Sequence, residues 1–186
     1  MPILRLAVKG IIYNLLEEVV SDEHGEDTWD ALVDAAGVDG VYTSLGSYAD
    51  EDLERLVAAA SEHLGASPDD VVRWFGRRTM PLFAQRYGEL FTAHASTRSL
   101  ALALNDVIHP EVHKLYPGAV TPVFAFDTSS QSTLVMEYRS ARRLCAFAEG
   151  LLHGTADHYG ERLTIERPQC VKCGDDRCVL AVTTRP

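Results

Sequence analysis

Tyr138-Arg139-Ser140-Ala141-Arg142 places three hydrogen-bond donors at every second position of the chain. In an extended segment the side chains of Tyr138, Ser140 and Arg142 share one face. A phenol, a hydroxyl and a guanidinium then converge, and the guanidinium can hold a carboxylate through two parallel bonds. The segment indicates a site for an anion with paired oxygens, but a solvated strand end is the simpler interpretation of these five residues alone.

Two histidines lie upstream, in the segment Leu104 to Ala119. His109 and His113 are one helical turn apart in a partly apolar setting, where a neutral imidazole is able to ligate iron. A histidine pair at this spacing also suits zinc, and one histidine on an apolar helix face is more often a packed core residue. Taken alone, the pair is a weak indication of a metal site.

Helical patterns dominate the chain up to about residue 113. Ser47 and Asp50 suggest a capping box for one helix, and we expect Pro81 and Pro110 to break or disturb two others. Apolar residues recur at helical spacing over 9–20, 27–36, 47–64, 67–91 and 97–113.

The hydrophobic period changes to two after Pro117-Gly118. A chain with helices first and then a four-stranded antiparallel sheet with one inserted helix has the element order of an α+β fold. The expected strands cover 123–126, 132–136, 163–165 and 178–182, and the inserted helix covers 141–159.

Composition excludes several functional classes. The 186 residues are enough for one domain or two lobes around a shared pocket. A net charge of −10, from 27 acidic and 17 basic residues, disfavours nucleic acid as a partner. No stretch is long and apolar enough to cross a membrane and the start is too short for a secretory signal, so we expect a cytoplasmic protein without a membrane partner.

Taken together, these segments resemble the haem nitric oxide/oxygen binding (H-NOX) family, the haem domain also found in soluble guanylate cyclases. The individual pieces are short, but their order and spacing are specific. The resemblance is carried by Val8-Lys9-Gly10-Ile11-Ile12, Asp50-Glu51-Asp52, Ile108-His109, Tyr116-Pro117-Gly118, Thr121-Pro122 and Tyr138-x-Ser140-x-Arg142.

The resemblance implies the α+β H-NOX fold, with about seven helices, a four-stranded antiparallel sheet and haem between two lobes. It implies a single domain over 8–186, with a helical distal lobe over about 8–66 and a proximal lobe over about 67–186. Met1 to Ala7 precede the usual family start. We expect this extension to be loosely ordered and without function.

The same resemblance assigns roles to individual residues. His109 becomes the proximal iron ligand of haem b, and His113 a bystander. Tyr138, Ser140 and Arg142 become the clamp for the haem propionates, and Pro122 the residue that presses on the porphyrin and distorts it. The positions at or near the distal side of the haem are Ile12, Leu16, Phe83, Phe147 and Leu151.

The implied function is gas sensing rather than catalysis. Oxygen-binding relatives carry a distal tyrosine five residues after the motif arginine, where this chain has Phe147. This implies binding of nitric oxide and carbon monoxide without a stable dioxygen complex. Nitric oxide would release His109 and shift the lobes, and the signal would pass in trans to a histidine kinase or diguanylate cyclase, because we expect no output domain after Pro186.

Two rival functions remain at this point. An enzyme would use His109 and His113 as acid and base, but no nucleophile or carboxylate accompanies them at a recognisable spacing. The other rival is a zinc-containing ligand-binding or redox-sensing module without haem iron.

All four cysteines lie in the last quarter of the chain. Cys170, Cys173 and Cys178 flank a tight turn, and Cys145 offers a fourth thiol on the preceding helix. Four thiolates suit structural zinc, and some bacterial H-NOX proteins look similar here, with a cysteine cluster proposed to bind zinc and sense redox state. The alternative is four reduced thiols packed as small hydrophobic groups.

Overall fold

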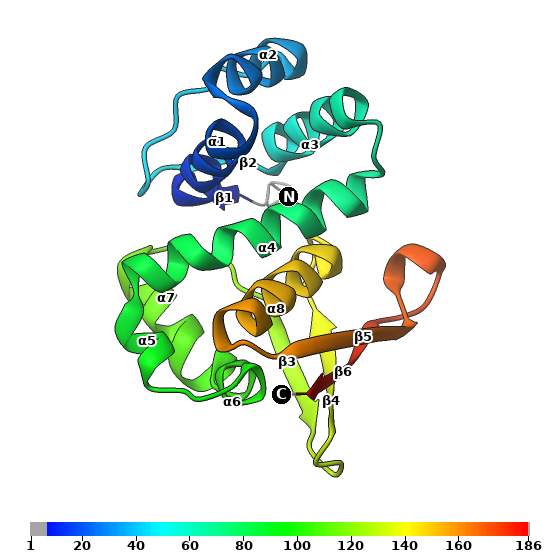
Figure 1. The fold of residues 1–186 in the computed structure, drawn as a ribbon. Helices are drawn as coiled ribbons and strands as arrows, with labels where there is room; N and C mark the ends of the chain where they lie inside the picture. The colour runs from blue at the N-terminus through cyan, green and yellow to red at the C-terminus, as the bar shows by residue number, and fades with distance from the viewer. Residues whose placement is uncertain (1–6, 186) are drawn as a thin grey trace, which may run out of the picture.

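The computed structural model describes residues 7–185. Within them, eight α-helices accompany a four-stranded antiparallel sheet and a smaller two-stranded one (Figure 1). The α+β prediction is confirmed, with one helix more than the seven expected. No helix in this range is long and apolar enough to cross a bilayer.

The first part of the fold is helical. A short antiparallel pair of strands, β1 and β2, opens it, and Ala7, which we had placed in the extension, is the first residue of β1; residues 1–6 lie outside the described range. Ser47 is not a helix cap as predicted, because it lies in β2, where its hydroxyl is 2.9 Å from Lys9 Nζ. The elements are β1 (Ala7–Lys9), α1 (Gly10–His24), α2 (Glu26–Ala36), β2 (Ser47–Ala49) and α3 (Asp50–Leu64).

The long helix α4 (Pro68–Arg86) runs through the middle of the molecule (Figure 1). It begins where predicted, with the Ser67 hydroxyl accepting a hydrogen bond from the Asp70 amide. Pro81 does not break it, because this residue lies on an exposed side of the helix and the turns around it are packed. The chain then turns at Tyr87 into the short helix α5 (Gly88–Thr92).

The helix expected over 97–113 is divided into three pieces: α6 (Thr97–Leu102), the π-helix η1 (Leu104–Ile108) and α7 (His109–Leu115). Pro110 lies in the first turn of α7. It has no N–H, and its ring would crowd the carbonyl four residues earlier in a regular α-helix. A wider π turn therefore accommodates the chain immediately before His109, and π turns are frequent at functional sites.

The last part of the fold is the sheet, ordered β3-β4-β6-β5 and antiparallel throughout. Alternation along β4 buries Leu134, Met136 and Tyr138 on the face covered by α8. The helix expected from 141 begins four residues later. The elements are β3 (Val123–Asp127), β4 (Thr133–Arg139), α8 (Cys145–Tyr159), β5 (Arg162–Gln169), the 3-10 turn η2 (Val171–Cys173) and β6 (Cys178–Arg185).

Helices α4 and α8 cross in direct backbone contact. A Cβ at Gly150 would lie 2.1 Å from the Arg73 carbonyl oxygen, and one at Gly154 would lie 2.5 Å from that of Arg77. On the opposite helix, a Cβ at Gly76 would lie 2.6 Å from the Phe147 carbonyl oxygen. The contact thus requires glycine on both helices.

We expect Gly150→Ala to destabilise the protein by about 1–3 kcal/mol, because the new methyl group would have to separate two backbones. Urea unfolding measures the change. Gly88→Ala is the matched control, since a Cβ there meets nothing within 4 Å and removal of a flexible glycine stabilises by up to about 1 kcal/mol. Equal unfolding midpoints for Gly150→Ala and the wild type would disprove the close crossing.

Candidate functional site

His109 is the first residue of α7 and is half-buried. Its ring is stacked on that of Phe124, with centroids 6.1 Å apart and planes at 27°. Burial, aided by the nearby His113, lowers the pKa of His109 to about 4. Neither ring nitrogen has a hydrogen-bond partner within residues 7–185. At neutral pH this imidazole is uncharged and has a lone pair free for a metal.

The position of His109 is set by Asn105 in the π turn. The side-chain amide of Asn105 donates to the Phe124 carbonyl at 2.6 Å, and its oxygen accepts from the Phe124 amide at 3.2 Å. These two bonds attach η1 to β3, and the Phe124 ring in turn contacts both His109 and Tyr138. His113, by contrast, is exposed, with Nε2 3.1 Å from the Thr121 hydroxyl.

Tyr138 lies near the end of β4 and is buried. Its hydroxyl accepts a hydrogen bond from the Leu144 amide at 3.2 Å, and burial raises its pKa, so the phenol keeps its proton for a further acceptor. The extended conformation predicted for the whole motif is wrong beyond Arg139, where the strand ends. Ser140 and Arg142 instead belong to a turn in which the Arg142 amide donates to the Ser140 hydroxyl at 3.3 Å.

Arg142 joins segments that are distant in the sequence. Its Nε donates to Asp50 Oδ2 at 2.9 Å, one Nη to the Val120 carbonyl at 2.7 Å, and the other Nη to the Ala7 carbonyl at 2.5 Å. Asp50 accepts from the partly buried guanidinium at the first residue of α3. From the sequence we had interpreted Asp50 only as a helix start. Its ion pair with Arg142 joins residues 92 positions apart, and no local sequence pattern indicates such a contact.

The guanidinium of Arg142 has donors to spare. It carries five N–H groups in a planar fork, and the three contacts to Asp50, Val120 and Ala7 use one each. The remaining donors, with the Tyr138 phenol, are able to bind an additional carboxylate. This arrangement fits the propionate of a haem group.

The apolar residues predicted for the distal side come from α1, α4 and α8. Leu16 is buried, whereas Ile12, Phe83, Phe147 and Leu151 are only half-buried at the rim of the packed clusters. The Phe147 ring stacks on Phe75 with centroids 5.3 Å apart. Such half-buried apolar surface is what a flat hydrophobic cofactor would cover.

The proximal and distal sets meet through one cluster. Phe83 and Leu151 both pack against the buried group Met80, Phe91 and Leu100, and so does Ile108, the residue before His109. Pro122 is half-buried immediately before β3. The structure therefore brings the residue before His109 together with two of the residues predicted for the distal side.

A sequence profile of the Haem-NO-binding family matches residues 9–167. The chain belongs to this family. No protein in a curated collection matches it.

Solved H-NOX structures support the assignment. An H-NOX protein from S. oneidensis, crystallised in the Fe(II)NO ligation state, is 34% identical, with 96% of this chain and 100% of that one covered and a TM-score of 0.89. An H-NOX domain from Shewanella oneidensis, solved by NMR in the Fe(II)CO ligation state, is also 34% identical, with coverage of 96% and 99% and a TM-score of 0.86. An oxygen-binding H-NOX domain related to soluble guanylate cyclases is 22% identical, with 96% of each chain covered and a TM-score of 0.80, which shows the shared fold. The family prediction is confirmed.

A second cluster consists of the buried thiols of Cys145, Cys170 and Cys178, whose sulfur atoms lie within 4.8 Å of one another. Cys170 Sγ is 3.8 Å from that of Cys145 and 3.9 Å from that of Cys178. Cys173, predicted as part of a four-thiol set, is exposed and outside this group, because η2 turns its side chain toward solvent. Cys178 also lines a cavity of about 310 Å³, together with Tyr138 and Ser140.

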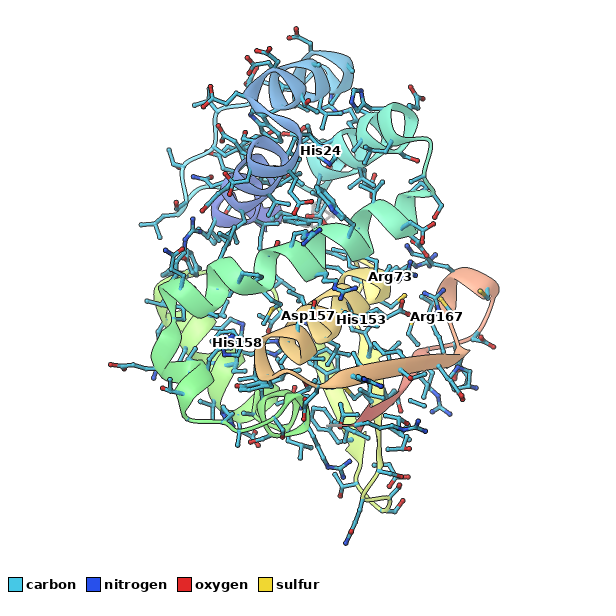
Figure 2. The ribbon with its side chains drawn as sticks, viewed as in Figure 1. His24, Arg73, His153, Asp157, His158 and Arg167 are labelled. Atoms are coloured by element: carbon cyan, nitrogen blue, oxygen red, sulfur yellow. The ribbon has the colours of Figure 1, made fainter. Side chains whose placement is uncertain are left out.

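Charged residues surround these thiols. Although burial opposes ionisation, hydrogen bonds from the Lys172 amide and the neighbouring thiols lower the pKa of Cys170. Arg167 Nη1 lies 3.8 Å from Cys145 Sγ and 3.3 Å from the buried carboxylate of Glu149, which also accepts from Arg73 at 2.8 Å. Figure 2 shows Arg73 and Arg167 at the end of α8 where the helix begins. The guanidinium favours negative charge on Cys170, whereas burial raises the pKa of the Cys145 thiol to about 12.

Proposed function

We propose that this chain is a haem-based gas sensor whose iron is held by His109. The observation that carries the proposal is the neutral, half-buried imidazole of His109, which has no hydrogen-bond partner within the described range and follows a π turn fixed to the sheet. When bound, haem b would supply a ferrous iron able to bind a diatomic gas, with His109 as the ligand that the protein provides. We propose no enzymatic activity for the chain.

The remaining site residues orient the cofactor. We assign Tyr138, Ser140 and Arg142 to its propionates, because the phenol keeps its proton and the guanidinium has spare donors. We assign Pro122 to contact with the porphyrin plane, since its rigid ring, immediately before β3, cannot easily move away from a neighbouring group. Ile12, Leu16, Phe83, Phe147 and Leu151 would exclude water from the distal side.

The proposed ligands are nitric oxide and carbon monoxide, the gases in the two 34% identical structures. Bound dioxygen gains negative charge and needs a donor, for which Phe147 has no hydroxyl. Tyr13 and Thr79 are the nearest alternatives in sequence, but the Tyr13 hydroxyl donates to the Ala49 carbonyl at 2.9 Å. The Thr79 hydroxyl donates to the Phe75 carbonyl at 2.8 Å. Neither is free to stabilise dioxygen.

Signalling would use two lobes, which we place at about 8–66 and 67–186. One buried cluster is formed mainly by residues from Val8 to Ala60, with Val71 and Phe75 of α4 completing it. Changes at His109 would therefore reach this lobe through α4. We propose output in trans to a separate histidine kinase or diguanylate cyclase, and no role for nucleic acid or membrane.

We also propose a zinc ion at the cysteine cluster. Two thiolates bound to one tetrahedral zinc at about 2.3 Å lie about 3.8 Å apart, which matches the Sγ distances of 3.8 and 3.9 Å around Cys170. Cys145, Cys170 and Cys178 would supply three ligands. A rotation of the exposed Cys173, three residues from Cys170, would supply the fourth.

His109→Gly should abolish haem retention, or make it depend on added imidazole, because the iron loses its protein ligand. His113→Ala is the matched control and should retain haem, since that side chain is exposed and bonded to Thr121. The ratio of Soret absorbance to protein absorbance measures retention. A normal Soret band in His109→Gly without imidazole would exclude His109 as the ligand.

The ferrous protein should respond to nitric oxide and carbon monoxide but keep its deoxygenated visible spectrum in air. Phe147→Tyr should add a hydrogen bond of about 0.5–1.5 kcal/mol and slow oxygen escape by several-fold. Absorption spectra in air and rapid-mixing kinetics measure both effects. If the reduced wild-type protein showed the split visible bands of a dioxygen complex in air, the proposed function would have to change from nitric oxide sensing to oxygen sensing.

Elemental analysis should find about one zinc per chain in addition to iron, and oxidants should release it. Cys170→Ser should remove most of the zinc, because this thiol is the centre of the cluster, whereas Cys173→Ser should have a smaller effect. Zinc content unaffected by Cys170→Ser, or a wild type with iron alone, would favour packed reduced thiols.

A further inference from the structure

Two tyrosine hydroxyls meet at the corner where α4 passes into α5. The hydroxyl oxygens of Tyr87 and Tyr116 lie 2.7 Å apart, in a partly buried setting. Burial and the bond to Tyr87 raise the pKa of Tyr116 to about 12, so the Tyr116 phenol keeps its proton. One phenol donates and the other accepts.

This pair joins the ends of two functional helices. Tyr116 is the residue at which α7 ends, and its amide donates to the Val112 carbonyl in the last turn. Tyr87 is the residue at which α4 ends, with its amide bonded to the Phe83 carbonyl. The hydroxyl bond thus runs from the helix that begins with His109 to the helix that carries Phe83.

Helix α7 has little else to hold it. None of its residues is buried, and η1 leads directly into it. Its further contacts within the described chain include the stacking of His109 on Phe124 and the bond between the exposed His113 and Thr121. The ion pair of Lys114 with Glu111 lies within the helix and exposed to solvent, so it does not fix α7 to its surroundings. A helix that is attached at its start through η1 requires a second attachment at its end to keep a fixed direction.

We propose that Tyr87 and Tyr116 are positioning residues that fix the direction of α7 and thereby the angle at which His109 is presented. The bond between them provides the second attachment. Its loss would leave α7 with η1 and the contacts of His109 and the exposed His113, and its last turn free to tilt about the π turn. The effect on the iron ligand rests on the proposed haem function, but the attachment of α7 does not.

The test uses Tyr87→Phe, Tyr116→Phe and the double variant, which remove hydroxyls and keep the rings. Tyr159→Phe is the matched control, because its hydroxyl donates to the Phe91 carbonyl at 2.8 Å, away from α7. Hydrogen exchange of the 112–116 amides reports the attachment. In haem-loaded protein, the iron–histidine stretching band in resonance Raman spectra reports how His109 is held.

Each single variant should raise amide exchange in α7 by about tenfold and shift the iron–histidine band. The double variant should match the singles, because one bond is lost in all three. Tyr159→Phe should change neither measurement. The proposal would be overturned if amide exchange and the iron–histidine band were unchanged in both single variants. It would also be overturned if the effects of the two substitutions added up in the double variant, or if Tyr159→Phe changed both measurements as much as the single variants do.

A wild type that holds no haem would refute the proposed function while leaving the exchange comparison valid. Increased exchange in the tyrosine variants with an unchanged iron–histidine band would retain the attachment but overturn its role in positioning His109. Failure of the sensor and failure of the tyrosine pair are therefore distinguishable.

Discussion

The backbone contact between α4 and α8 is the constraint on which the site depends. Because Gly76, Gly150 and Gly154 leave no side chains between the helices, neither can be displaced without moving the other. Helix α4 presents Phe75 and Phe83 to the helical part of the molecule, and α8 presents Phe147 and Leu151 to the same region and Cys145 to the sheet. A rigid pair of helices thus supports both candidate sites, which use different faces of the first half of α8.

A second constraint is the set of bonds around Arg142. This side chain is held by partners in β1, at the start of α3 and before β3, so four chain segments have to be in place before it is oriented. A guanidinium oriented in this way needs little reorganisation to receive a carboxylate. The same bonds hold β1 and the start of α3 against the turn that follows β4. Under the proposed function, changes around a propionate held by Arg142 would therefore reach both lobes.

Much of the fold was predictable from periodicity, and the failures have identifiable causes. Helices of eleven or more residues and the strands of the larger sheet carry enough repeats to be found, whereas β1 and β2 have three residues each. Ser47 satisfies the local rule for a helix cap, but pairing with Lys9 gives it a different role. The π turn follows from Pro110, a residue we had noted, although its effect on helix type depends on the tertiary contact with Phe124. At the site, motif order predicted roles for His109 and Arg142. The contacts of Arg142 with Asp50 and of Asn105 with Phe124 join residues too far apart in sequence to be inferred.

Asn105 has a consequence for the sheet itself. Strand β3 is at one edge of the order β3-β4-β6-β5, where unpaired backbone groups can recruit a strand from another molecule. At Phe124 both outward groups, the N–H and the carbonyl, are occupied by the side-chain amide of Asn105. The amide acts as a one-residue substitute for a neighbouring strand, so the bonds that place the histidine also protect this edge against self-association.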